Sequence, residues 1–549
     1  MTPGRDAKAL LRVHRAFLLL LAVFVPLAIH FAWHLDIATL GDDSVSYLAL
    51  ASYYSGHVSD PLLARWTWWS AHFPPLFPLL LAATGAWRDL LVAHLLVALC
   101  SVAGFILAYR LALLVLEEAD AALGVAFLFA ITPSAWVNTL GIMSDPLYLA
   151  TTVGALAVYE SRLTRPGSRD ADWLLFGLLV ALGCLTRLVG MALVVALVAN
   201  ELATALRRRK RPRVRELAIA LWPTAVLVGG WMWLRPTAGF DQYHDIVQLN
   251  LRGWTHSFGE VAPFALGAVR DAWIASFTID SSVSPAMRIV FAGVGALAVA
   301  GAAMSAWRGR IHGWYALGFT AILVGWVFGE ETTRRLIYPI VPVALIQAAL
   351  ALREVLKRLP PSPRALRYAA PALVTLTILL ALPGMVLVQR RSLDRDPVLD
   401  GFAYSYADFR DYYESHGPDA RARAAGNLAS LAGLRALPGV TPRDAKILWF
   451  RPEYLAFLAD RECVPWYNSW DARELARQIR SANVDYVAFP RYLKSDLTMR
   501  LADPTPLVAS IREYSDLVMA IPDPGDEGKN GFMLFKIERK ALEGYLAKS

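Results

Sequence analysis

Two short acidic segments carry residue types that suit proton transfer. The first runs from Gly41 to Tyr47 (GDDSVSY) and places Asp42 and Asp43 side by side. The second places Asp145 directly before a proline, in the sequence MSDPLY. Aspartates before helices often act as caps, so capping is one interpretation of both segments. A carboxylate beside apolar sequence also suits general-base work, and the residues alone leave both interpretations open.

Three arginines stand where a membrane protein could meet an anion. Arg187 lies between two short apolar runs in LTRLVG, where a cation is costly unless it reaches water or an anionic partner. Arg334 and Arg335 follow two glutamates in GEETTRRLIYP, with Tyr338 as a further donor. A phosphate would satisfy such guanidinium groups with bidentate geometry. The alternatives are that Arg187 snorkels to lipid headgroups and that the second segment is a self-neutralising surface turn.

A proline-broken apolar segment separates the first acidic motif from the next long apolar run. Residues 73–81 follow His72 and contain Pro74 and Pro75, which exclude a regular helix start. Broken apolar backbone at membrane depth is tolerated where it packs on protein or lines a cavity. Together with Tyr47, which begins a stretch expected to lie along the membrane surface, the segment could shape a groove for a lipid chain or an acceptor. A simple turn between a surface helix and a membrane span is the alternative.

The composition indicates that membrane helices must position these residues. The 549 residues are 56% hydrophobic and their mean hydropathy is +0.41, which lies outside the soluble globular range. A net charge of +8 could suggest nucleic acid, but the basic residues cluster in short loops between apolar runs, as in membrane proteins. The first apolar run follows four basic residues without a small-residue cleavage site, so we predict a retained signal-anchor helix.

A transmembrane helix needs about 20 apolar residues. By that criterion residues 1–389 hold about eleven transmembrane helices, at approximately 16–34, 90–115, 120–139, 146–162, 173–187, 189–206, 216–235, 286–306, 313–329, 336–352 and 369–389. The apolar stretch Pro74–Ala83 is too short to span and is expected to be re-entrant or interfacial.

The distribution of Lys and Arg gives these spans a direction. Four of the five loops that follow even-numbered spans are rich in Lys and Arg, which predicts that they face the cytoplasm. The N-terminus is then cytoplasmic, and loops 35–88 and 236–285 lie on the outer face of the inner membrane. The densest run, Arg207–Arg215, is interpreted as a topology signal, with binding of anionic lipid as the alternative.

Residues 390–549 are predicted to form an extracytoplasmic α/β domain. Charges become frequent there and strand-like and helix-like segments alternate. The strands are expected at Lys446–Phe450, Asp485–Phe489, Leu517–Ile521 and Phe532–Ile537, and the helices at Tyr454–Leu458 and Arg473–Ile479. The sequence lacks G-x-G-x-x-G, Walker A and C-x-x-C motifs, and its three cysteines encode no disulfide framework. An acceptor-binding or stabilising module is therefore expected, not a second catalytic unit.

Taken in order, the segments resemble the GT-C superfamily of glycosyltransferases. They are most similar to bacterial relatives of protein O-mannosyltransferases and of the aminoarabinose transferase that modifies lipid A. The shared features are an acidic motif before a tyrosine, a proline-rich run, an acid before Pro-Leu, a Leu-Thr-Arg-x-x-Gly segment and an Arg-x-x-x-Pro-x-x-Pro helix start. Here they are Asp43 with Tyr47, Pro74–Leu81, Asp145, Leu185–Gly190, and Arg335 with Pro339 and Pro342.

The resemblance implies an inverting transfer of a sugar from a polyprenyl-phosphate donor to an acceptor hydroxyl on a glycan, lipid or protein. Asp43 would be the general base, with Asp42 as the alternative because the motif reads Asp-Asp where relatives often have Asp-Glu. Asp145 would orient the acceptor or share the base role. Arg187, and Arg334 or Arg335 with Tyr338, would bind the donor phosphate. No cofactor or metal is expected, since such relatives mostly lack a required metal and no His/Cys ligand set is visible.

Two other functions stay open from the sequence. A transporter or flippase for lipid-linked sugars would also have many spans, but it would typically show internal repeats or ionisable residues near the membrane midplane. A non-catalytic scaffold or receptor would use the external domain as its working part. The enzymatic interpretation requires Asp43, Asp145 and Arg187 to converge on one outward-facing cavity.

Overall fold

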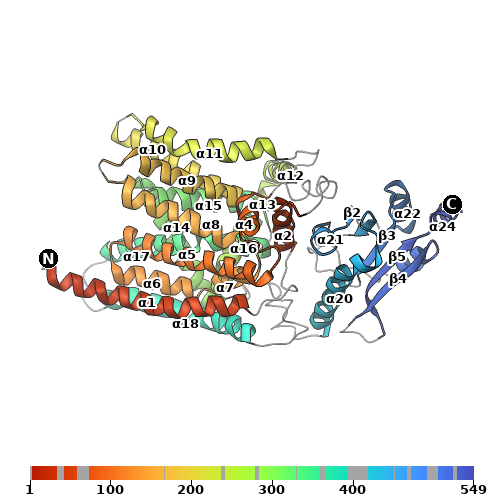
Figure 1. The fold of residues 1–549 in the computed structure, drawn as a ribbon. Helices are drawn as coiled ribbons and strands as arrows, with labels where there is room; N and C mark the ends of the chain where they lie inside the picture. The colour runs from red at the N-terminus through yellow and green to blue at the C-terminus, as the bar shows by residue number, and fades with distance from the viewer. Residues whose placement is uncertain are drawn as a thin grey trace.

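The protein is described from a computed structural model of the chain. The residues described are 3–33, 42–57, 73–165, 167–209, 211–235, 242–278, 283–328, 330–358, 365–393, 418–449, 452–466, 471–490, 505–523 and 528–548. Figure 1 shows a bundle of helices at one end of the molecule and a smaller α/β unit at the other, with the N-terminus at the far end of the bundle.

The bundle consists of helices that are apolar over most of their length. They are α1 (Pro3–Trp33), α2 (Asp42–Tyr54), α4 (Leu76–Ala83), α5 (Leu90–Leu116), α6 (Ala119–Ala130), α7 (Pro133–Leu140), α8 (Asp145–Val158), α9 (Asp170–Thr186), α10 (Met191–Arg208), α11 (Val214–Leu234), α12 (Gln242–His256), α13 (Phe258–Thr278), α14 (Pro285–Trp307), α15 (Ile311–Gly325), α16 (Glu330–Ile337), α17 (Val341–Arg358) and α18 (Ala365–Leu393). A π-turn (Tyr159–Leu163) follows α8, and 3-10 turns precede α10 (Leu188–Gly190) and α17 (Tyr338–Ile340).

The predicted fold class is confirmed: the chain is a polytopic helical membrane protein with a C-terminal α/β sheet region. Every predicted span coincides with a helix. Among the described residues, seven helical segments are long and apolar enough to cross a membrane, or eight when the bent pair α6–α7 counts as one. The estimate of about eleven is higher because it also counted α8, α9 and α15, whose helices have 14, 17 and 15 residues.

Two segments expected in external loops are helices packed into the protein. The stretch from Ser44 to Ser52 in α2 is buried along its whole length, so the expectation of an amphipathic helix on the membrane surface is wrong. α2 packs against α4 on one side and a helix of the C-terminal unit on another. The loop expected at 236–285 contains α13, which packs against α14, α16 and α18.

Small residues let neighbouring helices of the bundle approach closely. A Cβ atom added at Gly301 of α14 would collide with the backbone carbonyl of Gln347 in α17. A Cβ atom at Gly177 of α9 would collide in the same way with Ala220 of α11. Helix association inside a membrane depends on such packing because lipid chains are as apolar as the helices.

The C-terminal unit is a five-stranded mixed sheet with helices. Its strands run in the order β2-β1-β3-β5-β4, with β1 parallel to β2 and β3, and β5 antiparallel to β3 and β4. The elements are α20 (Pro418–Val440), β1 (Lys446–Trp449), α21 (Pro452–Ala459), β2 (Glu462–Pro465), α22 (Ala472–Ser481), β3 (Tyr486–Pro490), α23 (Thr505–Arg512), β4 (Ser515–Pro522), β5 (Asn530–Ile537) and α24 (Arg539–Ala547). The four predicted strands and two predicted helices are all present. β2 was missed because its four residues, ECVP, begin with a charged residue and end with a proline, both of which are uncommon in strands.

The C-terminal unit docks on the helix that carries the first acidic motif. α21 packs on α2, and one hydrophobic cluster joins Val45 and Leu48 of α2 to Leu455 of α21 and to the sheet. Burial of this apolar surface fixes α2 between the bundle and the sheet.

Replacing Gly301 by alanine is expected to destabilise the bundle by about 2 kcal/mol, because the new methyl group forces α14 and α17 apart. The measurement is the apparent melting temperature of the detergent-solubilised protein. Gly293→Ala in the same helix is the matched control, since its Cβ meets nothing within 4 Å. Equal melting of the two variants would contradict the packing argument.

Candidate active site

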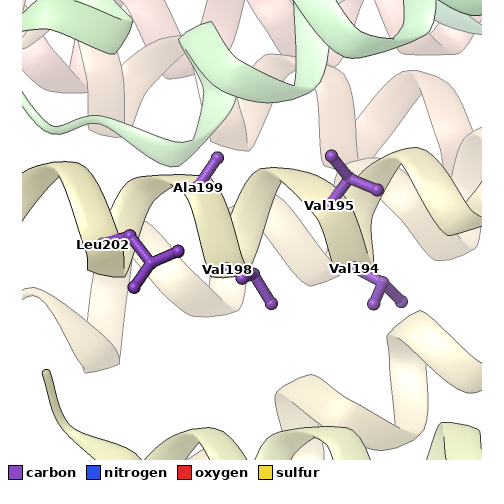
Figure 2. Close-up of a pocket in the computed structure, with 5 residues that line it drawn as sticks. All are labelled: Val194, Val195, Val198, Ala199 and Leu202. Atoms are coloured by element: carbon purple, nitrogen blue, oxygen red, sulfur yellow. The ribbon is translucent and has the colours of Figure 1, made fainter.

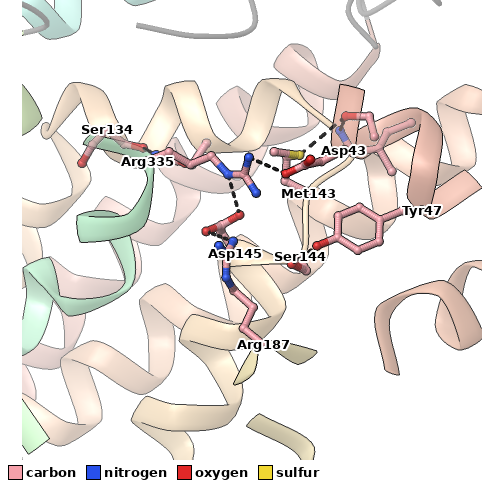
Figure 3. A network of polar contacts seen from close by, with 11 residues as sticks. Asp43, Tyr47, Ser134, Met143, Ser144, Asp145, Arg187 and Arg335 are labelled. Carbon is pink, nitrogen blue, oxygen red and sulfur yellow. Dashed lines mark hydrogen bonds and ion pairs between the residues drawn. The ribbon is translucent and has the colours of Figure 1, made fainter. Parts of the chain in front are cut away.

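A chain of ion pairs links three of the segments singled out in the sequence. Asp145, the first residue of α8, is completely buried, and its Oδ1 lies 2.5 Å from Nη1 of Arg187. Its Oδ2 lies 3.4 Å from Nε of Arg335. The Nη1 of Arg335 in turn lies 2.5 Å from Oδ2 of Asp43. Figure 3 shows Asp145 between the two guanidinium groups, with Asp43 beyond Arg335.

The local backbone explains how these side chains reach one another. Arg187 follows the last residue of α9 in an extended conformation, and a 3-10 turn separates it from α10, so it lies at a break between two helices. Arg335 lies in the last turn of α16, just before a second 3-10 turn that begins at Tyr338. Each arginine therefore projects from a helix end, where the chain changes direction.

Asp145 does not act as a simple helix cap. Ser144 occupies the cap position of α8 and makes no side-chain cap hydrogen bond, with Pro146 in the first turn. The Asp145 carboxylate contacts the two guanidinium groups instead. Such a buried carboxylate is stable only because its charge is compensated in place.

A second layer of contacts holds the two acidic segments together. The hydroxyl groups of Tyr47 and Ser144 are hydrogen-bonded at 2.7 Å, which ties α2 to the residue before Asp145. Ser44 accepts a hydrogen bond of 3.1 Å from the backbone N–H of Ile142. Burial raises the pKa of the Tyr47 hydroxyl, so it stays protonated and serves as a hydrogen-bonding group. These contacts fix α2, and with it Asp43, against the loop that carries Asp145.

The remaining predicted residues lie around this cluster or outside the described part of the chain. Pro74 and Pro75 are buried just before α4, whose Phe77 ring packs edge-on against Tyr47 at 5.0 Å. Arg334 is 3% exposed in α16. Tyr338 is buried and its ring lies 6.1 Å from that of Phe129, so it belongs to the hydrophobic core of the bundle.

The side chains of two predicted residues lie outside the described part of the structure. His72 lies outside the described residues. Asp42 is the first residue of α2, and its side chain also lies outside the described part. The contribution of Asp42 therefore stays a prediction from the sequence.

Sequence reasoning missed the two serines that connect the acidic segments. Ser44 and Ser144 each stand next to a predicted aspartate, and this adjacency was the available signal. Their function as connectors depends on a pairing between residues 97 or 98 positions apart, which one sequence does not reveal.

A second polar cluster, not anticipated from the sequence, is buried elsewhere in the bundle. Glu160 lies 3.0 Å from Arg310 and 3.7 Å from His312, and His312 is hydrogen-bonded to Gln347 at 2.6 Å. Gln347 accepts a further hydrogen bond of 2.7 Å from Ser305. The cluster joins the π-turn to α14, α15 and α17, so it fixes these helices to one another.

Two further features of the described residues bear on the ligands that the protein could bind. No group of three His, Cys, Asp or Glu side chains there could hold a metal ion. A shallow depression of about 320 Å³ on α10 is lined by apolar side chains alone (Figure 2): Val194, Val195, Val198, Ala199 and Leu202. Val195 and Leu202 are well exposed, which suits contact with lipid chains and not with a polar substrate.

The fold matches solved structures over nearly the whole chain. ArnT from Cupriavidus metallidurans, solved with undecaprenyl phosphate, aligns over 95% of this chain and 98% of its own, with 16% identity and a TM-score of 0.56. An oligosaccharyltransferase from Archaeoglobus fulgidus, tethered to an acceptor peptide, aligns over 93% and 74%, with 15% identity and a TM-score of 0.54. The chain has the GT-C fold.

The GT-C likeness extends to a much larger protein. The arabinofuranosyltransferase AftD from mycobacteria aligns over 94% of this chain but 40% of its own length, with 18% identity and a TM-score of 0.52. Neither a protein-family model nor a curated protein matches the sequence. The resemblance seen in the motifs is therefore borne out at the level of fold.

Replacing Arg187 by glutamine is expected to cost about 3 kcal/mol of stability, because the fully buried Asp145 loses its nearest counter-charge. Thermal melting in detergent is the measurement. The double variant Arg187→Gln, Asp145→Asn is expected to recover most of the loss, since it leaves no uncompensated carboxylate. Equal stability of wild type and the single variant would show that the Arg187–Asp145 ion pair does not contribute to stability.

Proposed function

We propose that this protein is a membrane glycosyltransferase that moves a sugar from a polyprenyl-phosphate donor to an acceptor hydroxyl. The observation that carries the proposal is the linked set Asp43–Arg335–Asp145–Arg187. It brings a partly exposed carboxylate within contact of a guanidinium group able to bind phosphate. The GT-C fold, shared with a protein solved with undecaprenyl phosphate, supports the same donor class.

The proposed reaction is a single inverting displacement. Asp43 accepts the proton of the acceptor hydroxyl as the acceptor oxygen forms a bond to the anomeric carbon. The bond between that carbon and the donor phosphate oxygen breaks, and its electron pair stays on the leaving polyprenyl phosphate. Asp43 is suited to the base role because it is 29% exposed, whereas Asp145 is completely buried.

The guanidinium groups stabilise the leaving phosphate. Arg335 is 31% exposed and Arg187 is 16% exposed, so part of each side chain is accessible from outside the cluster. Charge grows on the phosphate as the glycosidic bond breaks, and cations already in place then stabilise the transition state more than the ground state. Asp145 contributes by holding both arginines in position. Arg334, which is buried and precedes Arg335 in the sequence, adds a further positive charge.

Residues 1–389 form the catalytic domain in this proposal, and residues 390–549 form an acceptor-binding or stabilising domain. The docking of α21 on α2 supports this division, because the domain then lies beside the helix that carries Asp43. The positive-inside pattern supports an inner membrane protein with a cytoplasmic N-terminus and this domain outside.

Replacing Asp43 by asparagine is expected to lower transfer by about 10²- to 10⁴-fold, the usual contribution of a general base. The measurement is release of polyprenyl phosphate from a panel of undecaprenyl-phosphate sugars by purified protein with membrane-extract acceptors. Asp271→Asn, which removes a carboxylate that pairs with Arg270 of α13 and Arg288 of α14, is the matched control and is expected to retain activity. Full activity of Asp43→Asn would refute the base assignment, and no turnover of any donor by wild type would refute the transferase.

A further inference from the structure

Arg335 holds two carboxylates with different parts of its guanidinium group. Its Nε faces Asp145 at 3.4 Å, and its Nη1 faces Asp43 at 2.5 Å. The shorter contact is therefore made with the carboxylate assigned as the base. A carboxylate oxygen engaged by a guanidinium group is a poor proton acceptor, because the neighbouring positive charge favours its ionised form.

The two contacts of Arg335 differ in how easily they can be exchanged. Asp145 is 0% exposed and has no access to water, so it depends on protein cations for compensation. Asp43 is 29% exposed, and water can hydrate it when a cation leaves. An incoming anion will therefore compete for Arg335 at the Asp43 side and leave the Asp145 side intact.

The charge balance of the cluster favours the same exchange. Asp43 and Asp145 oppose Arg187 and Arg335, so the contacting groups are neutral as a set. A donor phosphate that enters makes the set negative. Proton uptake by Asp43, the step required of a general base, then offsets the negative charge that develops on the leaving phosphate.

We propose that the phosphate of the lipid-linked donor takes the Nη1 side of Arg335 from Asp43, and that this exchange makes Asp43 available as the base only when the donor is bound. The inference rests on the proposed function and adds substrate control to it. Arg335 keeps its contact with Asp145 through Nε. Only its Nη1 contact changes, from Asp43 to the phosphate. Without donor, the acceptor hydroxyl meets a carboxylate that is already engaged.

A double-mutant cycle on lipid-phosphate affinity tests the exchange. The probe is undecaprenyl phosphate, titrated into the purified full-length protein in nanodiscs. Asp43→Asn removes the competitor for Arg335 and is expected to tighten binding by roughly tenfold, a typical coupling for groups in direct contact. In the Arg335→Gln background the same Asp43→Asn change is expected to alter affinity by less than about twofold, because the competition no longer exists.

The cycle separates competition from simple charge repulsion. Repulsion between Asp43 and phosphate would give an equal or larger gain in the Arg335→Gln background, and that result would overturn the inference while leaving the proposed function intact. If wild type does not bind undecaprenyl phosphate, the proposed function fails and this inference with it. Arg335→Lys keeps the positive charge if the glutamine variant does not fold, and a reduced but measurable gain from Asp43→Asn is then expected. Asp271→Asn is the control and should leave affinity unchanged.

Discussion

The buried carboxylate of Asp145 is the constraint on which the arrangement of the site depends. A charge with no access to water must be compensated by cations held in place, and two guanidinium groups meet it here. Those groups come from the ends of α9 and α16, nearly 150 residues apart in sequence. The three helix ends must therefore meet at one point of the bundle, and Asp43 joins them through Arg335.

Much of the site could be predicted from the sequence because each of its segments interrupts an apolar run. Asp145, Arg187 and Arg335 are costly at their positions unless they are paired, and this cost is visible without a structure. The pairing itself was not visible. Capping was the alternative interpretation of Asp145. In the structure its carboxylate contacts two arginines, and Ser144 occupies the cap position.

The errors of sequence reasoning have a common physical cause. Burial inside a membrane protein is set by neighbouring protein as well as by lipid, so hydrophobic periodicity did not reveal that α2 is enclosed by α4 and α21. The basic run Arg207–Arg215 also makes contacts within the protein that the sequence did not predict. Arg207 donates to the carbonyl of Ala306, and Arg213 contacts Glu201 at 2.5 Å. Part of that run therefore contacts helices of the bundle, in addition to any effect on membrane topology or lipid binding.

The C-terminal domain helps to fix the position of Asp43, because it packs on the helix that carries this residue. A helix that carried Asp43 on a mobile loop could not keep the carboxylate within contact of Arg335. α2 is instead held by the sheet domain through α21, by α4 through Phe77, and by Ser144 through Tyr47. With the backbone of Asp43 fixed from three sides, the variable part of the site is the partner of its carboxylate. In the proposed mechanism, this rigid frame around one exchangeable ion pair makes proton transfer depend on whether a phosphate is bound.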